Sequence, residues 1–213
     1  MKIGIIGTGM VGQTIGAKLV SMGHDVMMGG REAGNEKVQA FVARTGGKPG
    51  SFADAAAFGE MVIHCTRGGT AIEALRQAGA GNLRGKILVD ISNPLDFSHG
   101  FPPSLSISNT DSLGETIQRE FPEALVVKTL NTVTASVMVD PAMIHGAHAV
   151  FVSGNDKHAK GKVMDLLRQF GWHAIYDLGD ITSARATEQM LPLWTRLYSV
   201  LGTGEFNFAI LKR

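Results

Sequence analysis

The residues best suited to chemistry stand at the start of the chain, where the segment GTGMVG spaces Gly7, Gly9 and Gly12 as G-x-G-x-x-G. An apolar run, 2–6, precedes these glycines, and a segment with helical periodicity, 10–22, follows them. The first glycine of such a turn permits a tight bend, the second lets a pyrophosphate approach the backbone, and the third lets the helix pack against the strand. The unpaired N–H groups of the helix would then face the phosphates. The pattern predicts a dinucleotide-binding turn; the alternative is a glycine-rich turn that only connects a strand to a helix.

The segment DVMMGGRE, which ends the second expected strand, predicts which dinucleotide is bound. NAD-binding proteins usually place an Asp or Glu here to bind the adenosine ribose, but this chain has Gly29, Gly30 and then Arg31. The two glycines would leave space, and a guanidinium can hold a 2′-phosphate in bidentate fashion. We therefore expect NADP rather than NAD. The alternative places Arg31 in solvent and gives the ribose to Glu32; Lys37 could add positive charge nearby.

Short apolar runs alternate with amphipathic segments along most of the chain, which is typical of strand-helix-strand units. The sequence predicts an α/β fold, a doubly wound Rossmann-type parallel sheet with a small, mainly helical C-terminal element. Strands are expected at 2–6, 24–28, 60–66, 86–92, 124–130, 148–154 and 173–178, with a brief edge strand in 47–52, and helices at 10–22, 33–45 and 157–170.

Two segments stand apart from this alternation. The irregular stretch 93–115 holds three of the seven prolines and is a candidate lid, because long loops inside compact domains are usually functional or mobile. We place a boundary near residue 180, so that 1–180 form the dinucleotide-binding domain. The remainder, 181–213, would close the cleft or form a dimer interface.

The composition narrows the class of protein. A chain of 213 residues suffices for one substantial domain, and a formal net charge of +1 gives no sign of a nucleic-acid or membrane surface. Cys65 is the only cysteine, so no internal disulfide can form, and a reducing, cytoplasmic compartment is expected. We expect no metal site, because His145 and His148 lack a third ligand nearby.

Five segments together carry a resemblance to a known family: GTGMVG, GGRE, DISNPL, VVKTLNTV and the tail EQMLPLWTRLYSVLGTGEFNF. With them the chain resembles the coenzyme F-420-dependent NADP oxidoreductases over nearly its whole length. It is also similar to the NADPH-binding domain of six-transmembrane metalloreductases. The resemblance implies a cleft in which hydride passes between NADP(H) and a flavin or deazaflavin such as coenzyme F-420. Family enzymes that act on the deazaflavin commonly have a His after the sixth strand, where this chain reads LNTVTASV, a version more similar to the flavin-linked branches.

The resemblance also implies which residues contact the cofactor. With the glycine turn and the second strand included, the expected cofactor-binding residues are Gly7, Thr8, Gly9, Met10, Val11, Gly12, Gly30, Arg31, Thr66, Arg67, Ser92, Asn93, Pro94, Asn131 and Thr132. The four residues of the turn after Gly7 would wrap the pyrophosphate, and those after the fifth and sixth strands would lie near the nicotinamide. All of them lie at the carboxyl ends of expected strands, where open parallel sheets bind their ligands.

No set of catalytic acid and base residues can be assigned, and hydride transfer between two rings can proceed by orientation alone. We expect His64 to be a hydrogen-bonded core residue, Cys65 a small buried hydrophobe, and Arg67 either a solvated residue or a contact to cofactor or acceptor. Trp194 and Tyr198 share a helical face and should pack in a core or an interface; the alternative is that they line a flavin cleft.

The most consistent function is hydride transfer from NADPH to a flavin or deazaflavin, a small-molecule acceptor. A non-catalytic NADP(H) sensor is the alternative. A β-hydroxyacid dehydrogenase fits less well because its catalytic Lys, followed four residues later by Asn, and its large helical domain are missing. The apolar residues of the tail exceed what a monomer core needs, so a homodimer is expected: Leu191, Leu193, Leu197, Val200 and Leu201.

Overall fold

The structure is a computed structural model that describes residues 1–213. Its centre is an eight-stranded sheet in the order β10-β9-β8-β5-β4-β1-β2-β3. The strands are β1 (Lys2–Ile6), β2 (Asp25–Gly30), β3 (Lys48–Ser51), β4 (Met61–His64), β5 (Ile87–Asp90), β8 (Leu125–Thr129), β9 (Ala149–Gly154) and β10 (Ala174–Asp177). The expected strands are therefore all present, and β3 is an edge strand as predicted.

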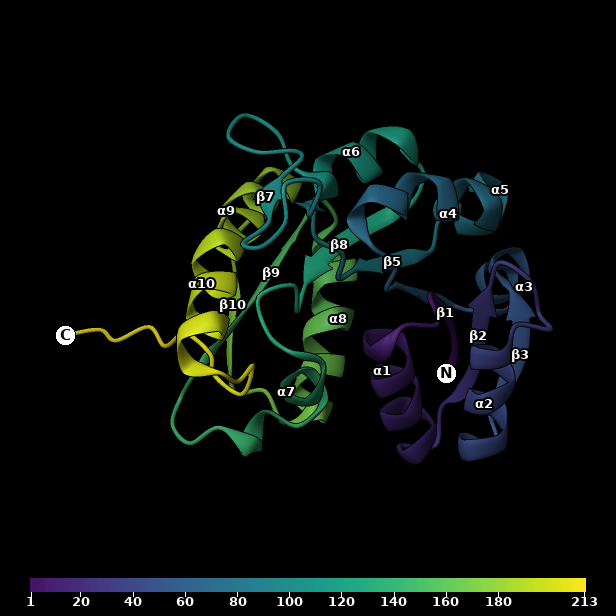
Figure 1. The fold of residues 1–213 in the computed structure, drawn as a ribbon. Helices are drawn as coiled ribbons and strands as arrows, with labels where there is room; N and C mark the ends of the chain where they lie inside the picture. Colours follow the sequence, from purple (N-terminus) through teal and green to yellow (C-terminus); the bar gives the residue numbers. More distant parts are fainter.

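Helices cover both faces of the sheet (Figure 1). One core contains side chains of α1 (Met10–Ser21), α2 (Glu36–Thr45), α7 (Ala135–Val139) and α8 (Lys157–Phe170). The other contains side chains of α3 (Phe52–Phe58), α4 (Ala71–Ala78), α5 (Ala80–Leu83), α6 (Leu113–Glu120) and α9 (Ala184–Gln189). This arrangement is the predicted doubly wound α/β fold, because apolar residues of the central strands β1, β4, β5 and β8 alternate between the two cores.

One part of the sheet differs from the prediction. The six strands from β8 to β3 are parallel, but β9 runs antiparallel to β8, and β10 is parallel to β9. The chain between β8 and β9 contains only the five-residue helix α7 and a 3₁₀ turn, Pro141–Met143, and so lacks the long crossover helix that usually returns the chain to the start of a parallel strand. Strand β9 consequently starts at the edge where β8 ends, and the sheet is mostly rather than wholly parallel.

The candidate lid is partly ordered by a small hairpin. Strand β6 (Leu95–Asp96) pairs antiparallel with β7 (Ser104–Leu105), outside the main sheet. This pairing holds the first residues of the stretch close to the carboxyl edge of β5.

The C-terminal residues form two consecutive helices and an extended tail. Helix α10 (Leu191–Leu201) follows α9 directly, and Pro192 lies in its first turn, where a proline is tolerated. After α10 the chain passes Thr134 closely at Gly204, the backbone O of Phe208 accepts a hydrogen bond from Ala149 N, and the last residues extend away from the body (Figure 1). No helix is long and apolar enough to span a membrane.

Candidate dinucleotide and acceptor site

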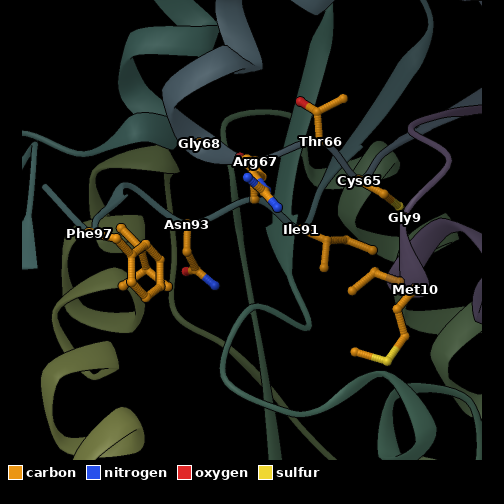
Figure 2. A pocket seen from close by; sticks show the side chains of 12 residues that line it. Gly9, Met10, Cys65, Thr66, Arg67, Gly68, Ile91, Asn93 and Phe97 are labelled. Atoms are coloured by element: carbon orange, nitrogen blue, oxygen red, sulfur yellow. The ribbon is translucent and has the colours of Figure 1, made fainter. Parts of the chain in front are cut away.

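A cavity of about 630 Å³ opens at the carboxyl ends of β1, β4 and β5 (Figure 2). Arg67 is the only charged side chain of its lining, and the other lining residues are Gly9, Met10, Val11, Cys65, Thr66, Gly68, Ile91, Ser92, Asn93, Leu95 and Phe97. A cavity with one guanidinium and no carboxylate suits an anionic ligand. The apolar side chains at its rim suit a planar ring.

The glycine turn has the geometry that its spacing predicts. Gly7 has a φ of +127°, which favours glycine. A Cβ at Gly12 would lie 2.2 Å from the carbonyl O of Gly7, so only glycine lets α1 approach the turn this closely. At Gly9, by contrast, a Cβ would meet no protein atom within 4 Å. The backbone at Gly9 therefore faces the open cavity.

Helix α1 begins beside this open space. Its cap, Gly9, supplies no side-chain hydrogen bond, and no acidic residue lies in the first turn. The unpaired N–H groups of the helix are thus available to an anion. The turn and the start of α1 fit the pyrophosphate of a dinucleotide.

The end of β2 is packed more tightly than we expected. A Cβ at Gly29 would lie 2.7 Å from Ser51 O, and a Cβ at Gly30 would lie 3.0 Å from Glu32 O. The expectation that these glycines leave space for a larger group is therefore wrong, because neighbouring protein atoms fill that space. Arg31 and Glu32 are both exposed, and Arg31 takes part in no ion pair.

A row of polar side chains lies buried next to the cavity. His64, Asp90 and Lys128 stand at paired positions of the adjacent strands β4, β5 and β8, and each is at most 1% exposed. His64 Nδ1 lies 2.9 Å from Asp90 Oδ1, and Lys128 Nζ lies 2.7 Å from Asp90 Oδ2. Lys128 also donates to the carbonyl O of Ser92 at 2.5 Å, so the row holds the backbone at the cavity in place.

Helix α9 completes the row with a second carboxylate. Glu188 Oε1 lies 2.8 Å from Lys128 Nζ, and the same carboxylate accepts hydrogen bonds from Leu113 N and Gly114 N at the start of α6. Burial alone would raise the pKa of Asp90, but Lys128 and His64 outweigh burial and hold this pKa well below its ordinary value. Burial would likewise lower the pKa of Lys128, yet Asp90 and Glu188 raise it. Asp90 and Lys128 are therefore both charged at neutral pH.

Further hydrogen bonds connect the expected cofactor residues. Asn93 Nδ2 donates to the carbonyl O of Asn131 at 2.8 Å, and Asn131 Nδ2 donates to Asn93 Oδ1 at 3.0 Å. This amide pair joins the segment after β5 to the segment after β8. Ser92 Oγ donates to Asp90 Oδ1 at 2.7 Å, and Thr66 Oγ1 lies 2.6 Å from His64 Nε2.

The structure gathers seven of the expected cofactor residues at the cavity: Gly9, Met10, Val11, Thr66, Arg67, Ser92 and Asn93. The eight others do not line it: Gly7, Thr8, Gly12, Gly30, Arg31, Pro94, Asn131 and Thr132. Of these eight, three belong to the glycine turn, Gly30 ends β2 and Arg31 follows it, and Pro94, Asn131 and Thr132 are buried.

Several smaller expectations can be compared with the structure. His64 is a hydrogen-bonded core residue, as expected. Cys65 is half-buried and lines the cavity; burial, followed by the charge of Asp90, raises the pKa of its thiol. Trp194 and Tyr198 share a helical face and stack with ring centroids 5.6 Å apart, but Tyr198 is 46% exposed, so the pair is not buried in a core.

Sequence reasoning missed Asp90, Lys128 and Glu188. A signal for the first two was present, because each is a charged residue within an otherwise apolar strand. His64, Asp90 and Lys128 are, moreover, the fourth residues of β4, β5 and β8. The cavity residues Ile91, Leu95 and Phe97 were also missed; the last two belong to the segment that we expected to act as a lid.

The chain is similar in sequence to one known family and to several individual proteins. The sequence model of the family "NADP oxidoreductase coenzyme F420-dependent" matches residues 2–94. The chain is 31% identical to the F420-dependent NADP reductase of Methanocaldococcus jannaschii over 155 residues, which cover 71% of this chain and 69% of that protein. It is 29% identical to Metalloreductase STEAP3 of Rattus norvegicus, covering 96% of this chain but only 40% of the relative's length.

A solved structure resembles the whole chain. It is that of a candidate F420-dependent NADP reductase from Arthrobacter sp. FB24, with 52% identity, a TM-score of 0.96 and complete coverage of both chains. The glycine turn and the open edge at Gly9 lie within the segment that the family model matches. On this sequence and structural similarity, the chain belongs to the F420-dependent NADP oxidoreductases, a family of NADP-dependent oxidoreductases.

Proposed function

We propose that this protein transfers hydride between NADP(H) and a flavin or a deazaflavin of the coenzyme F-420 type. The observation that carries the proposal is the open start of α1 at Gly9, on a cavity whose only charge is Arg67. The glycine turn is evidence for a pyrophosphate-binding site next to the cavity. The apolar rim of the cavity is evidence for a site that binds a second, planar ring. The family to which the chain belongs makes this pairing of ligands the most economical explanation.

The protein's part in this reaction would be to bind and orient. The N–H groups after Gly9 would hold the pyrophosphate, Arg31 the 2′-phosphate, and Arg67 the anionic parts of either ligand. The Asn93–Asn131 amide pair would fix the segments beside the nicotinamide. NADPH supplies the hydride when bound, and transfer requires its C4 to lie about 3 to 3.5 Å from the accepting atom. Phe97 and Ile91 would help to exclude water.

The proposal can be tested with the purified protein. NADPH is mixed with FMN, FAD or coenzyme F-420, and oxidation of the nicotinamide is followed by its absorbance, with NADH as the matched donor. We expect at least one acceptor to be reduced, faster with NADPH than with NADH. Tight NADPH binding without reduction of any acceptor would contradict the proposal and favour a non-catalytic sensor of NADP(H).

The second part of the proposal concerns how the acceptor is bound. Leu95 and Phe97 belong to the lid candidate and border the cavity, and Phe97 is 57% exposed. An exposed phenyl ring at a cavity rim can stack on a flat heterocycle. The variant Phe97→Ala should therefore raise the KM for the acceptor while leaving the Kd for NADPH unchanged, with Phe101→Ala, a comparably exposed phenylalanine outside the cavity, as control.

We also propose that the protein is a homodimer and that it works in a reducing, cytoplasmic compartment. Residue 180 would be the boundary between the dinucleotide-binding domain, 1–180, and the C-terminal element, 181–213. The cavity is lined by no residue of 181–213, so an interface role suits this element better than closure. Its exposed apolar side chains support that role: Leu193, Tyr198, Val200, Leu201, Ile210 and Leu211. Sedimentation at micromolar concentration tests this point, since a monomer would contradict it, and a chain with Val200→Glu should dissociate where Ser199→Glu does not.

A further inference from the structure

A hydrogen-bonded chain of three side chains links the buried polar row to the cavity. Asp90 Oδ1 lies 2.9 Å from Nδ1 of His64, and Nε2 of the same ring lies 2.6 Å from Oγ1 of Thr66. Asp90 and His64 are fully buried, whereas Thr66 is half-buried and stands at the cavity beside Arg67 (Figure 2). Of these three residues, only Thr66 lines the cavity.

The partners of Asp90 fix one proton of His64. Oδ1 also accepts from the backbone N–H and the hydroxyl of Ser92, and Oδ2 accepts from Lys128. An ionised carboxylate can only accept hydrogen bonds, so Nδ1 of His64 must carry a hydrogen. Nε2 then accepts from the Thr66 hydroxyl when the ring is neutral, and donates to its oxygen when the ring is charged.

The charges around His64 favour a second proton on the ring. Asp90 and Glu188 are two carboxylates that share the single ammonium of Lys128, so a proton on His64 balances the row. At the level of His64, β1 contributes only the apolar Ile6. Of the other titratable groups nearby, Cys65, which follows β4, is a neutral thiol. Helix α6 carries Glu115, Arg119 and Glu120, each paired with a side chain of opposite charge.

We propose that Asp90, His64 and Thr66 form a proton relay that serves the acceptor in the cavity. This inference rests on the proposed reductase function. Hydride from NADPH brings two electrons and one proton to the acceptor, which still lacks one proton for neutrality. Thr66 gives its hydroxyl proton to the acceptor while His64 gives its Nε2 proton to Thr66. After the reduced acceptor is released, His64 regains a proton from solvent through Thr66. Overall, NADPH, the oxidised acceptor and one proton yield NADP⁺ and the acceptor reduced by two electrons.

The first test uses variants at the cavity end of the relay. Thr66→Val removes the hydroxyl with little change of shape, Thr66→Ser keeps it, and Thr45→Val removes a half-buried hydroxyl remote from the cavity. Acceptor reduction is measured in single turnovers between about pH 5 and 8, the range in which histidines usually titrate. We expect Thr66→Val to slow reduction about tenfold or more and to lose the decline in rate with rising pH. Thr66→Ser, which keeps the hydroxyl, should restore the rate and the pH profile. Thr45→Val should leave the rate, the pH profile and the Kd for NADPH unchanged.

The second test follows His64 itself and does not depend on turnover. Nitrogen-15 NMR of histidine-labelled protein reports which ring nitrogen carries a proton and how this changes with pH. We expect a proton on Nδ1 throughout and titration at Nε2 that shifts in Thr66→Val but not in Thr45→Val. A neutral His64 with its proton on Nε2, or a Thr66→Val enzyme with the parental rate and pH profile, would overturn the relay. If no acceptor is reduced, the proposed function is wrong, and the NMR result alone decides whether His64 exchanges its proton through Thr66.

Discussion

Lys128 Nζ lies 2.8 Å from Glu188 Oε1, and both side chains are only 1% exposed. Through this contact the C-terminal helix α9 is bound to the middle of the sheet. The Lys128 ammonium also binds Asp90 and the carbonyl O of Ser92, so the same group fixes the segment that borders the cavity. The stability of the fold and the shape of the candidate site thus depend on one buried cation.

Removing this cation should cost much of the stability of the protein. In Lys128→Met two carboxylates remain buried without their partner, and we expect the free energy of unfolding to fall by about 3 to 5 kcal/mol. Glu188→Gln leaves Lys128 paired with Asp90 and should cost about 1 to 3 kcal/mol. Urea denaturation measures both changes.

The matched control is Glu123→Gln. Glu123 pairs with Arg84, but both side chains are more than half exposed, and exposed ion pairs contribute about 0 to 1 kcal/mol. An equal loss for Glu123→Gln and Glu188→Gln would show that burial does not determine the strength of these pairs.

Acid should destabilise the protein through the same row. Because the folded-state pKa of Asp90 is held below its ordinary value, its contribution is present above the unfolded-state pKa of about 3.9 and is lost as the pH falls below it. The urea midpoint should therefore decline as the pH falls below about 4, and the decline should continue at lower pH. In Asp90→Asn the midpoint is lower at neutral pH but declines less steeply in acid. Asp96→Asn serves as control, since that half-buried carboxyl lies outside the row and its removal should leave the steep decline intact.

The glycine turn was predictable from sequence because all its requirements are local. Gly7, Gly9 and Gly12 lie within six residues, and the strand and helix that flank them determine what each glycine must do. The buried row was not predictable in this way. It joins β4, β5, β8 and α9, and its contacts depend on the order of strands in the sheet.

The direction of β9 and the packing at β2 were missed for related reasons. A short apolar strand carries no signal of direction, and only the connection from β8, with its short helix α7, determines it. Gly29 and Gly30 were interpreted as space for a ligand, although their Cβ positions are occupied by atoms of β3, α3 and the segment after β2. Sequence shows that a glycine is required at a position, but structure shows whether a ligand or the protein itself requires it.

Substitutions of two glycines should separate binding from folding. In Gly9→Ala the new Cβ meets no protein atom, so stability should change by less than about 0.5 kcal/mol, while the Kd for NADPH rises at least about tenfold. In Gly12→Ala the Cβ would lie 2.2 Å from Gly7 O, so stability should fall by about 1 to 3 kcal/mol. Thermal unfolding and fluorescence titration with NADPH measure the two effects. Unchanged NADPH binding by a folded Gly9→Ala protein would remove the pyrophosphate from this turn.

The choice between NADPH and NADH tests Arg31. Arg31 is exposed directly after β2 and has no carboxylate partner, so its guanidinium can meet a 2′-phosphate. Arg31→Ala should weaken NADPH binding by about 1.5 to 3 kcal/mol, the strength of a charged hydrogen bond, and leave NADH binding nearly unchanged. Arg168→Ala, which removes an exposed arginine from α8, should affect neither cofactor. Equal losses for both cofactors in Arg31→Ala would exclude a 2′-phosphate contact. A selective loss of NADH binding in Glu32→Ala would instead assign the ribose to that carboxylate, because only a ribose hydroxyl, and not a phosphate, donates a hydrogen bond to it.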